Sequence, residues 1–172
     1  EGVHYKLKND NLYFNGSYQG ALSDTWDVFG GMSYTHSKND VNVTKMLIND
    51  TENAIHAKLK FKKRFSNRFK LYFGAEYFAD DFNEDFSENN SNEVYGYNDN
   101  IAAAYIEADI FISKKLAFKT GFRTEYSELF KEFSLAPRLS LAYKTSNKSQ
   151  VSLAYGNFYQ NPSSNILKYN QD

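Results

Sequence analysis

Apolar and polar residues alternate along most of this chain, and a period of two is typical of β-strands with one apolar and one polar face. Between positions 116 and 126, Leu116, Phe118 and Phe122 share one face, whereas Lys119 and Arg123 share the other. The pattern predicts strands of about ten residues each. These strands span Asn11–Gln19, Trp26–His36, Ala54–Phe65, Phe69–Phe78, Ile101–Ile112, Leu116–Tyr126, Phe133–Lys144 and Gln150–Tyr159, with a further short strand within Val3–Lys8.

The connections between the predicted strands alternate in length. Short connections such as Gly20–Thr25 and Ser66–Arg68 take turns with the long polar segments Ser37–Asn53 and Ala79–Asn100. In an up-and-down antiparallel sheet, connections of one parity lie at the same end, so one end carries tight turns and the other carries loops. This asymmetry is typical of outer-membrane barrels, and strands of about ten residues match a tilted membrane crossing. The alternative is a soluble sandwich or lipocalin-like barrel, in which strands average about five or six residues.

Composition narrows the classes of protein that remain. The 172 residues correspond to about one domain, and 20 basic against 21 acidic residues give a net charge of −1. We expect no nucleic-acid partner, because binding to phosphates requires a basic excess or stripe. The absence of cysteine excludes disulfides, thiolate metal sites and a cysteine nucleophile. No uninterrupted apolar stretch is long enough for a transmembrane helix, but barrel strands alternate and remain compatible with this polar composition.

Aromatic side chains are unusually frequent in so polar a chain. One Trp, 14 Tyr and 15 Phe make up 17% of the residues. Rings with one polar end prefer the boundary between lipid headgroups and hydrocarbon. We therefore expect Tyr34, Tyr77, Tyr126 and Tyr155 to lie towards the outer aromatic girdle of a membrane barrel.

Histidines and carboxylates were considered as ligands for metal ions. His4, His36 and His56 are far apart in sequence, and none has a neighbour at metal-binding spacing. The acidic segment 80–88 lacks the glycine and the ligand spacing of an EF-hand loop, so a solvated surface loop is favoured over a calcium site. We expect no metal site.

Paired carboxylates at Glu107 and Asp109 could suggest acid and base catalysis. If Ser113–Lys115 is a three-residue hairpin loop, however, Asp109 lies opposite Lys119 and Tyr105 lies opposite Arg123. Pairing of charges across strands then explains these carboxylates without catalysis. We expect no catalytic residues, no cofactor and no enzymatic activity.

The second half of the chain carries three consecutive motifs. Gly121–Ser127 reads GFRTEYS, Ala136–Lys144 reads APRLSLAYK, and Ser152–Pro162 reads SLAYGNFYQNP. This series resembles the barrel of TonB-dependent outer-membrane receptors, in which a Glu-Tyr strand end, a Pro-Arg strand and a Tyr-Gly strand follow in this order. The resemblance is clear between about 102 and 169, while residues 11–78 agree mainly in strand rhythm.

The resemblance implies a fold and a function. The fold is all-β, with residues 1–172 forming about eight strands of an antiparallel up-and-down barrel of about 22 strands in the outer membrane of a Gram-negative bacterium. The implied function is energised uptake of a scarce nutrient, with siderophore, peptide, glycan and cobalamin not distinguished. The implied partners are outer-membrane lipid and the TonB complex, which the receptor would contact through an N-terminal region that this sequence does not contain.

This sequence shows neither a plug domain nor a signal peptide. Glu1–Lys8 has no basic start, apolar run or cleavage site, so either a signal has been removed or the sequence is an internal piece. The alternative to a large receptor is a small closed eight-stranded outer-membrane barrel with a structural or adhesive role.

The alternation assigns side chains to the two faces of the wall. Positions on the polar face are expected to face the lumen and to contact a plug or a substrate: Lys58, Glu76, Glu107, Asp109, Lys119, Arg123, Glu125 and Arg138. Positions on the apolar face are expected to face lipid: Leu116, Phe118, Phe122, Leu139, Leu141, Val151 and Leu153. Small residues on the polar face of the last three strands indicate either close docking of a plug or tight strand curvature: Gly121, Ala136, Ser140, Ala142, Ser152, Ala154 and Gly156.

The short turns also predict the register. A three-residue turn centred on Asn67 places Lys58 opposite Glu76 and Lys62 opposite Tyr72. A one-residue slip would turn Lys58 and Glu76 towards hydrocarbon, so the polar face itself specifies this pairing.

Overall fold

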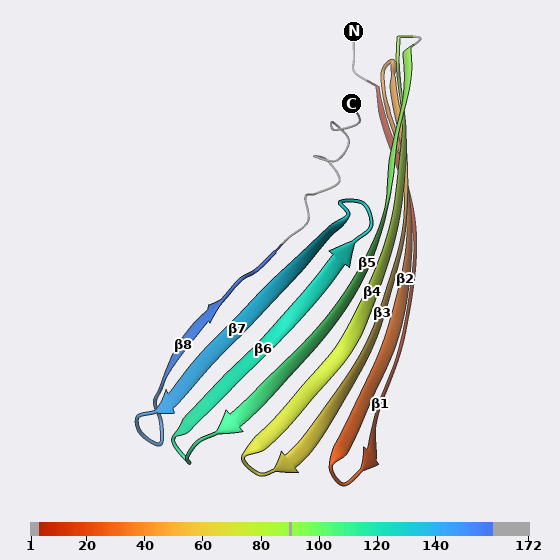
Figure 1. Cartoon of the computed structure of the whole chain (residues 1–172). Helices are drawn as coiled ribbons and strands as arrows, with labels where there is room; N and C mark the ends of the chain where they lie inside the picture. Colours follow the sequence, from red (N-terminus) through yellow and green to blue (C-terminus); the bar gives the residue numbers. More distant parts are fainter. Residues whose placement is uncertain (1–3, 90, 160–172) are drawn as a thin grey trace.

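The computed structural model describes residues 4–89 and 91–159, which form a single sheet of eight antiparallel strands (Figure 1). The strands are β1 (Tyr5–Ser23), β2 (Trp26–Val43), β3 (Met46–Ser66), β4 (Phe69–Glu88), β5 (Ser91–Phe111), β6 (Leu116–Ser127), β7 (Glu132–Lys144) and β8 (Gln150–Gly156). Each strand pairs with the next along the chain, which confirms the all-β up-and-down architecture. Within the described ranges β1 and β8 do not pair with each other, so the sheet is open. No helix long and apolar enough to cross a membrane occurs in these ranges.

The first five strands are longer than the sequence pattern predicted. Ser37–Asn53 and Ala79–Asn100 were expected to be loops, but they continue β2 into β3 and β4 into β5 as paired strands. In Figure 1 these two hairpins rise above the ends of β6 and β7. The prediction was wrong because both segments are rich in Asn, Asp and Glu, which strands usually lack, although pairing of the backbone continues through them.

The ends of the sheet also differ in detail from the prediction. The segment 11–19 and the short strand expected within 3–8 belong to one strand, β1, as far as the described residues reach. At the other end, β8 ends at Gly156 rather than at Tyr159. Polar residues and a glycine at these boundaries obscured the true strand ends.

The predicted register is confirmed at both hairpins. Lys58 lies opposite Glu76, and Lys62 lies opposite Tyr72, across the β3–β4 pair. Asp109 lies opposite Lys119 across the β5–β6 pair. The turn at Asn67 differs from the prediction, because Ser66 pairs with Phe69 around a two-residue turn. The register shift between Arg64 and Ser66 compensates for the shorter turn, so the predicted pairing holds beyond it.

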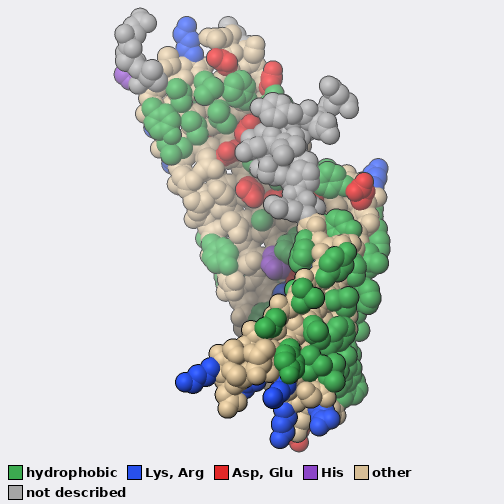
Figure 2. Space-filling view, turned by 90° about the vertical axis from the view of Figure 1, so that its left-hand side faces the viewer, with side chains coloured by type: hydrophobic (Ala, Val, Ile, Leu, Met, Phe, Trp, Pro, Cys, Tyr) green, Lys and Arg blue, Asp and Glu red, His purple; other side chains and the backbone are tan. Residues whose placement is uncertain are grey.

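The two faces of the sheet separate polar from apolar side chains near the tight turns. The inner face, which lines the hollow of the curved sheet, carries Lys58, Glu76 and Arg123. The outer face carries Leu116, Phe118, Phe122, Leu139, Leu141, Val151 and Leu153. The four girdle tyrosines Tyr34, Tyr77, Tyr126 and Tyr155 also lie on the outer face. Figure 2 shows hydrophobic side chains covering one outer flank, and their contact with lipid remains a prediction.

The tip of the β2–β3 hairpin contains a strained residue. Thr44 has a φ of 56°, a conformation that costs a β-branched residue about 1 to 2 kcal/mol. Thr44→Gly should therefore stabilise the hairpin tip by about 1 kcal/mol, measurable as slower amide hydrogen exchange in residues 38–50. Thr51→Gly in the middle of β3 is the control and should speed exchange, because glycine weakens a strand interior. Faster exchange in the Thr44 variant would contradict the strain.

Candidate functional site

The inner face divides into two levels of different charge. The lower wall consists of the inner-face positions from the tight turns up to the level of Lys58 and Glu76. The upper wall consists of the inner-face positions within 37–43, 46–52, 80–88 and 91–99, which belong to the two long hairpins. At about 3.3 Å per residue and a 45° tilt, the 12 residues from Arg68 to Asp80 rise about 28 Å, roughly the height of the apolar band of a barrel. In the predicted membrane barrel, the upper wall would therefore begin at the outer edge of the membrane-spanning part.

A network of ion pairs crosses the lower wall. The Lys58 Nζ lies 2.5 Å from the Glu76 Oε1, and the Arg123 Nη1 lies 2.6 Å from the Glu76 Oε2. The other terminal nitrogen of Arg123 lies 3.1 Å from a Glu125 carboxylate oxygen. Glu76 is 9% exposed, so its two cationic partners compensate a nearly buried charge. The network links β3, β4 and β6 across β5.

The remaining carboxylates of the lower wall are also paired. The Lys62 Nζ lies 2.7 Å from an Asp27 carboxylate oxygen. The Lys119 Nζ lies 3.2 Å from a Glu107 carboxylate oxygen and 3.8 Å from an Asp109 carboxylate oxygen. Glu107 is therefore closer to Lys119 than Asp109, which is the predicted partner directly opposite. These contacts fix the register and neutralise the charges.

Arg138 lies apart from this network. Its guanidinium carbon lies 5.1 Å from the centre of the Phe158 ring, and its buried Nε has no hydrogen-bond partner among the described residues. The neighbouring Gly121 has a local reason to be small, because a Cβ there would lie 2.7 Å from the Glu107 Cγ and 2.8 Å from a backbone oxygen of Ile106. Close packing within the sheet thus accounts for this glycine. Docking of a plug on the other small residues remains a prediction.

The upper wall is acidic. Its carboxylates are Asp50, Glu52, Asp80, Glu84, Glu88, Glu93 and Asp99, and the inner-face positions of the four ranges that define this wall carry no Lys or Arg. The sequence analysis treated 80–88 as a solvated loop. That prediction was wrong, because the segment is part of β4, and alternation sends Asp80 and Glu84 inward but Asp81 and Asp85 outward. No cluster of potential metal ligands was found among the described residues.

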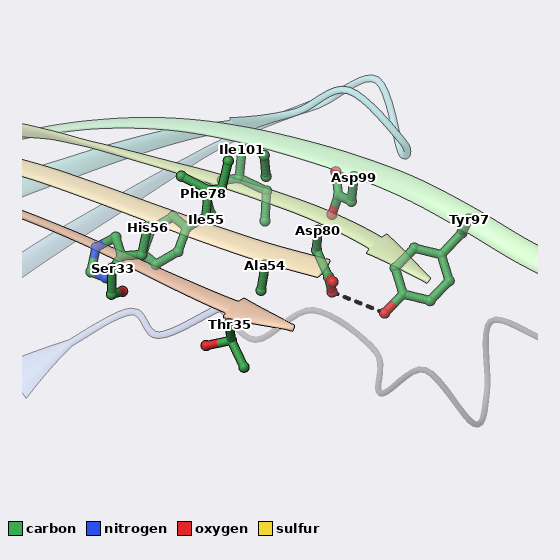
Figure 3. Close-up of a pocket in the computed structure, with 11 residues that line it drawn as sticks. Ser33, Thr35, Ala54, Ile55, His56, Phe78, Asp80, Tyr97, Asp99 and Ile101 are labelled. Atoms are coloured by element: carbon green, nitrogen blue, oxygen red, sulfur yellow. Dashed lines mark hydrogen bonds between the residues drawn. The ribbon is translucent and has the colours of Figure 1, made fainter. Parts of the chain in front are cut away.

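A recess of about 360 Å³ lies where the two levels meet (Figure 3). At one end the His56 ring stacks on the Phe78 ring, with the ring centres 4.1 Å apart and the planes 10° from parallel. At the other end the Tyr97 hydroxyl donates a 3.0 Å hydrogen bond to the Asp80 Oδ2, and Asp99 lies directly opposite Asp80. The remaining lining residues come from β2 to β5: Ser33, Thr35, Ala54, Ile55, Ala79 and Ile101.

Three groups in or beside the recess have raised pKa values. Burial and the nearby Asp99 raise the pKa of Asp80 above its usual value, and burial with the nearby Asp80 raises the pKa of Glu52. Burial and the hydrogen bond to Asp80 also raise the pKa of Tyr97, so this phenol remains a proton donor. Asp99 is held in place by the Ser127 hydroxyl at 2.8 Å and by the backbone amide of Leu129 at 3.3 Å.

The predicted lumen-facing residues all belong to the lower wall, and none of them lines the recess. One signal was available. Every second residue of this segment faces inward, from Glu76 through Phe78 to Asp80. Continuing this alternation would have assigned the acidic residues of 80–88 to the two faces in turn.

A comparison with models of protein families matches residues 2–171 to the β-barrel of TonB-dependent receptor-like proteins. The chain belongs to this family. A search of curated protein sequences found no match. As a TonB-dependent receptor barrel, the chain is part of a transport and receptor family rather than an enzyme family, and the open eight-stranded sheet is consistent with part of such a barrel.

Proposed function

We propose that this chain forms part of the wall of an outer-membrane receptor that takes up a scarce nutrient with energy delivered by the TonB complex. The observation that carries the proposal is the family match over residues 2–171, which includes every described strand. An open sheet supports it further, because two unpaired strand edges in lipid are very costly and must be closed by more strands. The proposed location is the outer membrane of a Gram-negative bacterium, with lipid against the outer face of β6 to β8.

The paired charges of the inner face suit a wall that encloses a plug domain. In the lower wall the five inward carboxylates all lie in ion pairs: Asp27, Glu76, Glu107, Asp109 and Glu125. A wall with satisfied charges can face a plug domain without leaving isolated ions at the contact. We propose that Lys58, Glu76, Arg123 and Arg138 belong to the plug-facing surface.

Binding of the native receptor to the soluble periplasmic domain of TonB tests this function without knowledge of the substrate. The receptor purified from its own membrane should be several times heavier than the 19.9 kDa of this chain and should retain TonB in a pull-down. The same receptor without its N-terminal region is the matched control and should not retain TonB. A native chain near 20 kDa that ignores TonB would instead indicate a small closed barrel with a structural or adhesive role.

A further inference from the structure

The outer face near the tight turns carries a single charge. On the outer face of β2 to β8, from these turns up to the level of Tyr77, Lys63 is the only charged side chain among the described residues. It lies three residues from the end of β3 and directly opposite Trp26 of β2. A lysine on a lipid-facing surface is unfavourable unless its long side chain carries the ammonium group to the headgroup region. We therefore expect lipid headgroups at the level of Lys63.

The ammonium group of Lys63 is held in place without a counter-charge. Its Nζ lies 4.8 Å from the centre of the Trp26 ring and donates a 2.8 Å hydrogen bond to the Thr25 Oγ1. Within 4–89 and 91–159, Lys63 forms no ion pair with a carboxylate, so further donors remain for an anionic group. Three lysines of the lower wall, by contrast, each contact a carboxylate: Lys58, Lys62 and Lys119.

An apolar hollow of about 420 Å³, which we call the outer recess, lies beside Lys63 on the same face. It is lined by Leu22, Ser23, Trp26, Phe61 and Phe73. The Phe73 ring stands perpendicular to the Trp26 ring at 6.0 Å and stacks on the Phe61 ring at 5.4 Å, so the aromatic side of the outer recess is tightly packed. Hydrocarbon suits such a lining. Since Trp26 contacts both the outer recess and the ammonium group, a matching ligand has an apolar part beside an anionic part.

The tight turns add positive charge at the same end of the sheet. Their charged residues are Arg68, Lys114, Lys115 and Lys148 against Asp24. Figure 2 shows Lys and Arg side chains gathered at this end, below the hydrophobic outer flank. Basic residues next to a membrane attract anionic lipids. Short turns of outer-membrane barrels lie on the periplasmic side, so the lipids in question belong to the periplasmic leaflet.

We propose that Lys63 and the outer recess bind one anionic phospholipid of the periplasmic leaflet. The lipid phosphate lies at the Lys63 ammonium group, and one acyl chain lies against Trp26, Phe61 and Phe73. This inference rests on the proposed function, which puts the outer face in lipid and the tight turns in the periplasm, and it adds a defined lipid site to that wall. A lipid is favoured over a protein partner because the outer recess is continuous with the uncharged surface that we propose to contact the bilayer.

The test uses the full-length receptor, purified in nonionic detergent and freed of bound lipid. Native mass spectrometry measures binding of the first added lipid, either phosphatidylglycerol, which is anionic, or phosphatidylcholine, which has no net charge. The receptor should bind phosphatidylglycerol roughly fivefold more tightly than phosphatidylcholine. Lys63→Gln should weaken binding of phosphatidylglycerol by roughly fivefold. Lys115→Gln, which removes an exposed lysine from the tight turn between β5 and β6, is the matched control and should leave it unchanged.

A second variant tests the apolar part of the site. Leu22 lines the outer recess and is 62% exposed, so Leu22→Ala is expected to leave the fold intact. The smaller side chain buries less of the acyl chain, and binding of both lipids should weaken by roughly threefold.

Three results would overturn the inference. One is equal binding of the two lipids by the unmodified receptor, a comparison that requires no variant. Another is an equal loss in Lys63→Gln and Lys115→Gln, which would mean that the general positive charge of the turns attracts the lipid. The third is unchanged lipid binding in Lys63→Gln or in Leu22→Ala. Retention of TonB by the same preparations distinguishes all three from a failure of the proposed function.

Discussion

Leu141→Arg should lower the fraction of the receptor that assembles in the outer membrane. Leu141 lies on the outer face between Phe118 of β6 and Leu153 of β8, and it is 40% exposed in the sheet. A charged side chain facing lipid costs roughly 2 to 4 kcal/mol at the middle of the bilayer and about 0 to 1 kcal/mol near its edges. Leu141 lies between these levels, three residues from the tight-turn end of β7, so we expect a cost of about 1 to 2 kcal/mol. This cost is a large fraction of the stability of an ordinary domain. Heat-modifiable migration of folded barrel in gels measures the assembled fraction.

The matched control is Ser140→Arg, one residue away on the inner face. Ser140 lies opposite Lys119 and Ala154, on the polar side that we propose to face the lumen. An arginine there can remain hydrated, because its long side chain can extend into the polar interior of the barrel. Equal loss of folded barrel at both positions would contradict the assignment of the outer face to lipid.

The sequence predicted the sheet best where one face had to be apolar. Near the tight turns, alternation reveals strand, face and register together, and Lys58 opposite Glu76 follows from one turn centred on Asn67. In the long hairpins this information is weaker, because Asp and Glu occur on both faces. Asp80 and Asp81 look alike in the sequence, although the fold sends them to opposite faces.

Ion pairs between strands that are not adjacent could not be predicted from the sequence either. Arg123 was correctly placed opposite Tyr105, yet its closest carboxylate oxygen belongs to Glu76, which lies on β4 with β5 in between. The residue of β5 between them is Ala103, which is 5% exposed and small enough to let the guanidinium reach across. A pairing rule for adjacent strands considers only direct neighbours, so it cannot find this contact.

The second large effect is expected at Glu76, where two cations meet one carboxylate. Glu76→Gln keeps the shape of the side chain but removes the charge that holds Lys58 and Arg123, each within 2.6 Å. Hydrogen bonds to charged groups contribute about 1.5 to 3 kcal/mol, so the free energy of unfolding should fall by about that amount. Urea unfolding of the full-length receptor in detergent or lipid, followed by tryptophan fluorescence, measures it.

Glu125→Gln separates the network from the loss of a single contact. Glu125 contacts only one of the two cations, through the Arg123 Nη2 at 3.1 Å and the Nε at 3.3 Å, and its side chain is 25% exposed. Its removal leaves Arg123 bound to Glu76, so the loss of stability should be less than half of that in Glu76→Gln. The double variant Glu76→Gln with Arg123→Gln should recover part of the loss, since it removes an uncompensated charge together with its partner. Additive losses in the double variant would show that Glu76 and Arg123 act independently and that the network does not hold β4 to β6.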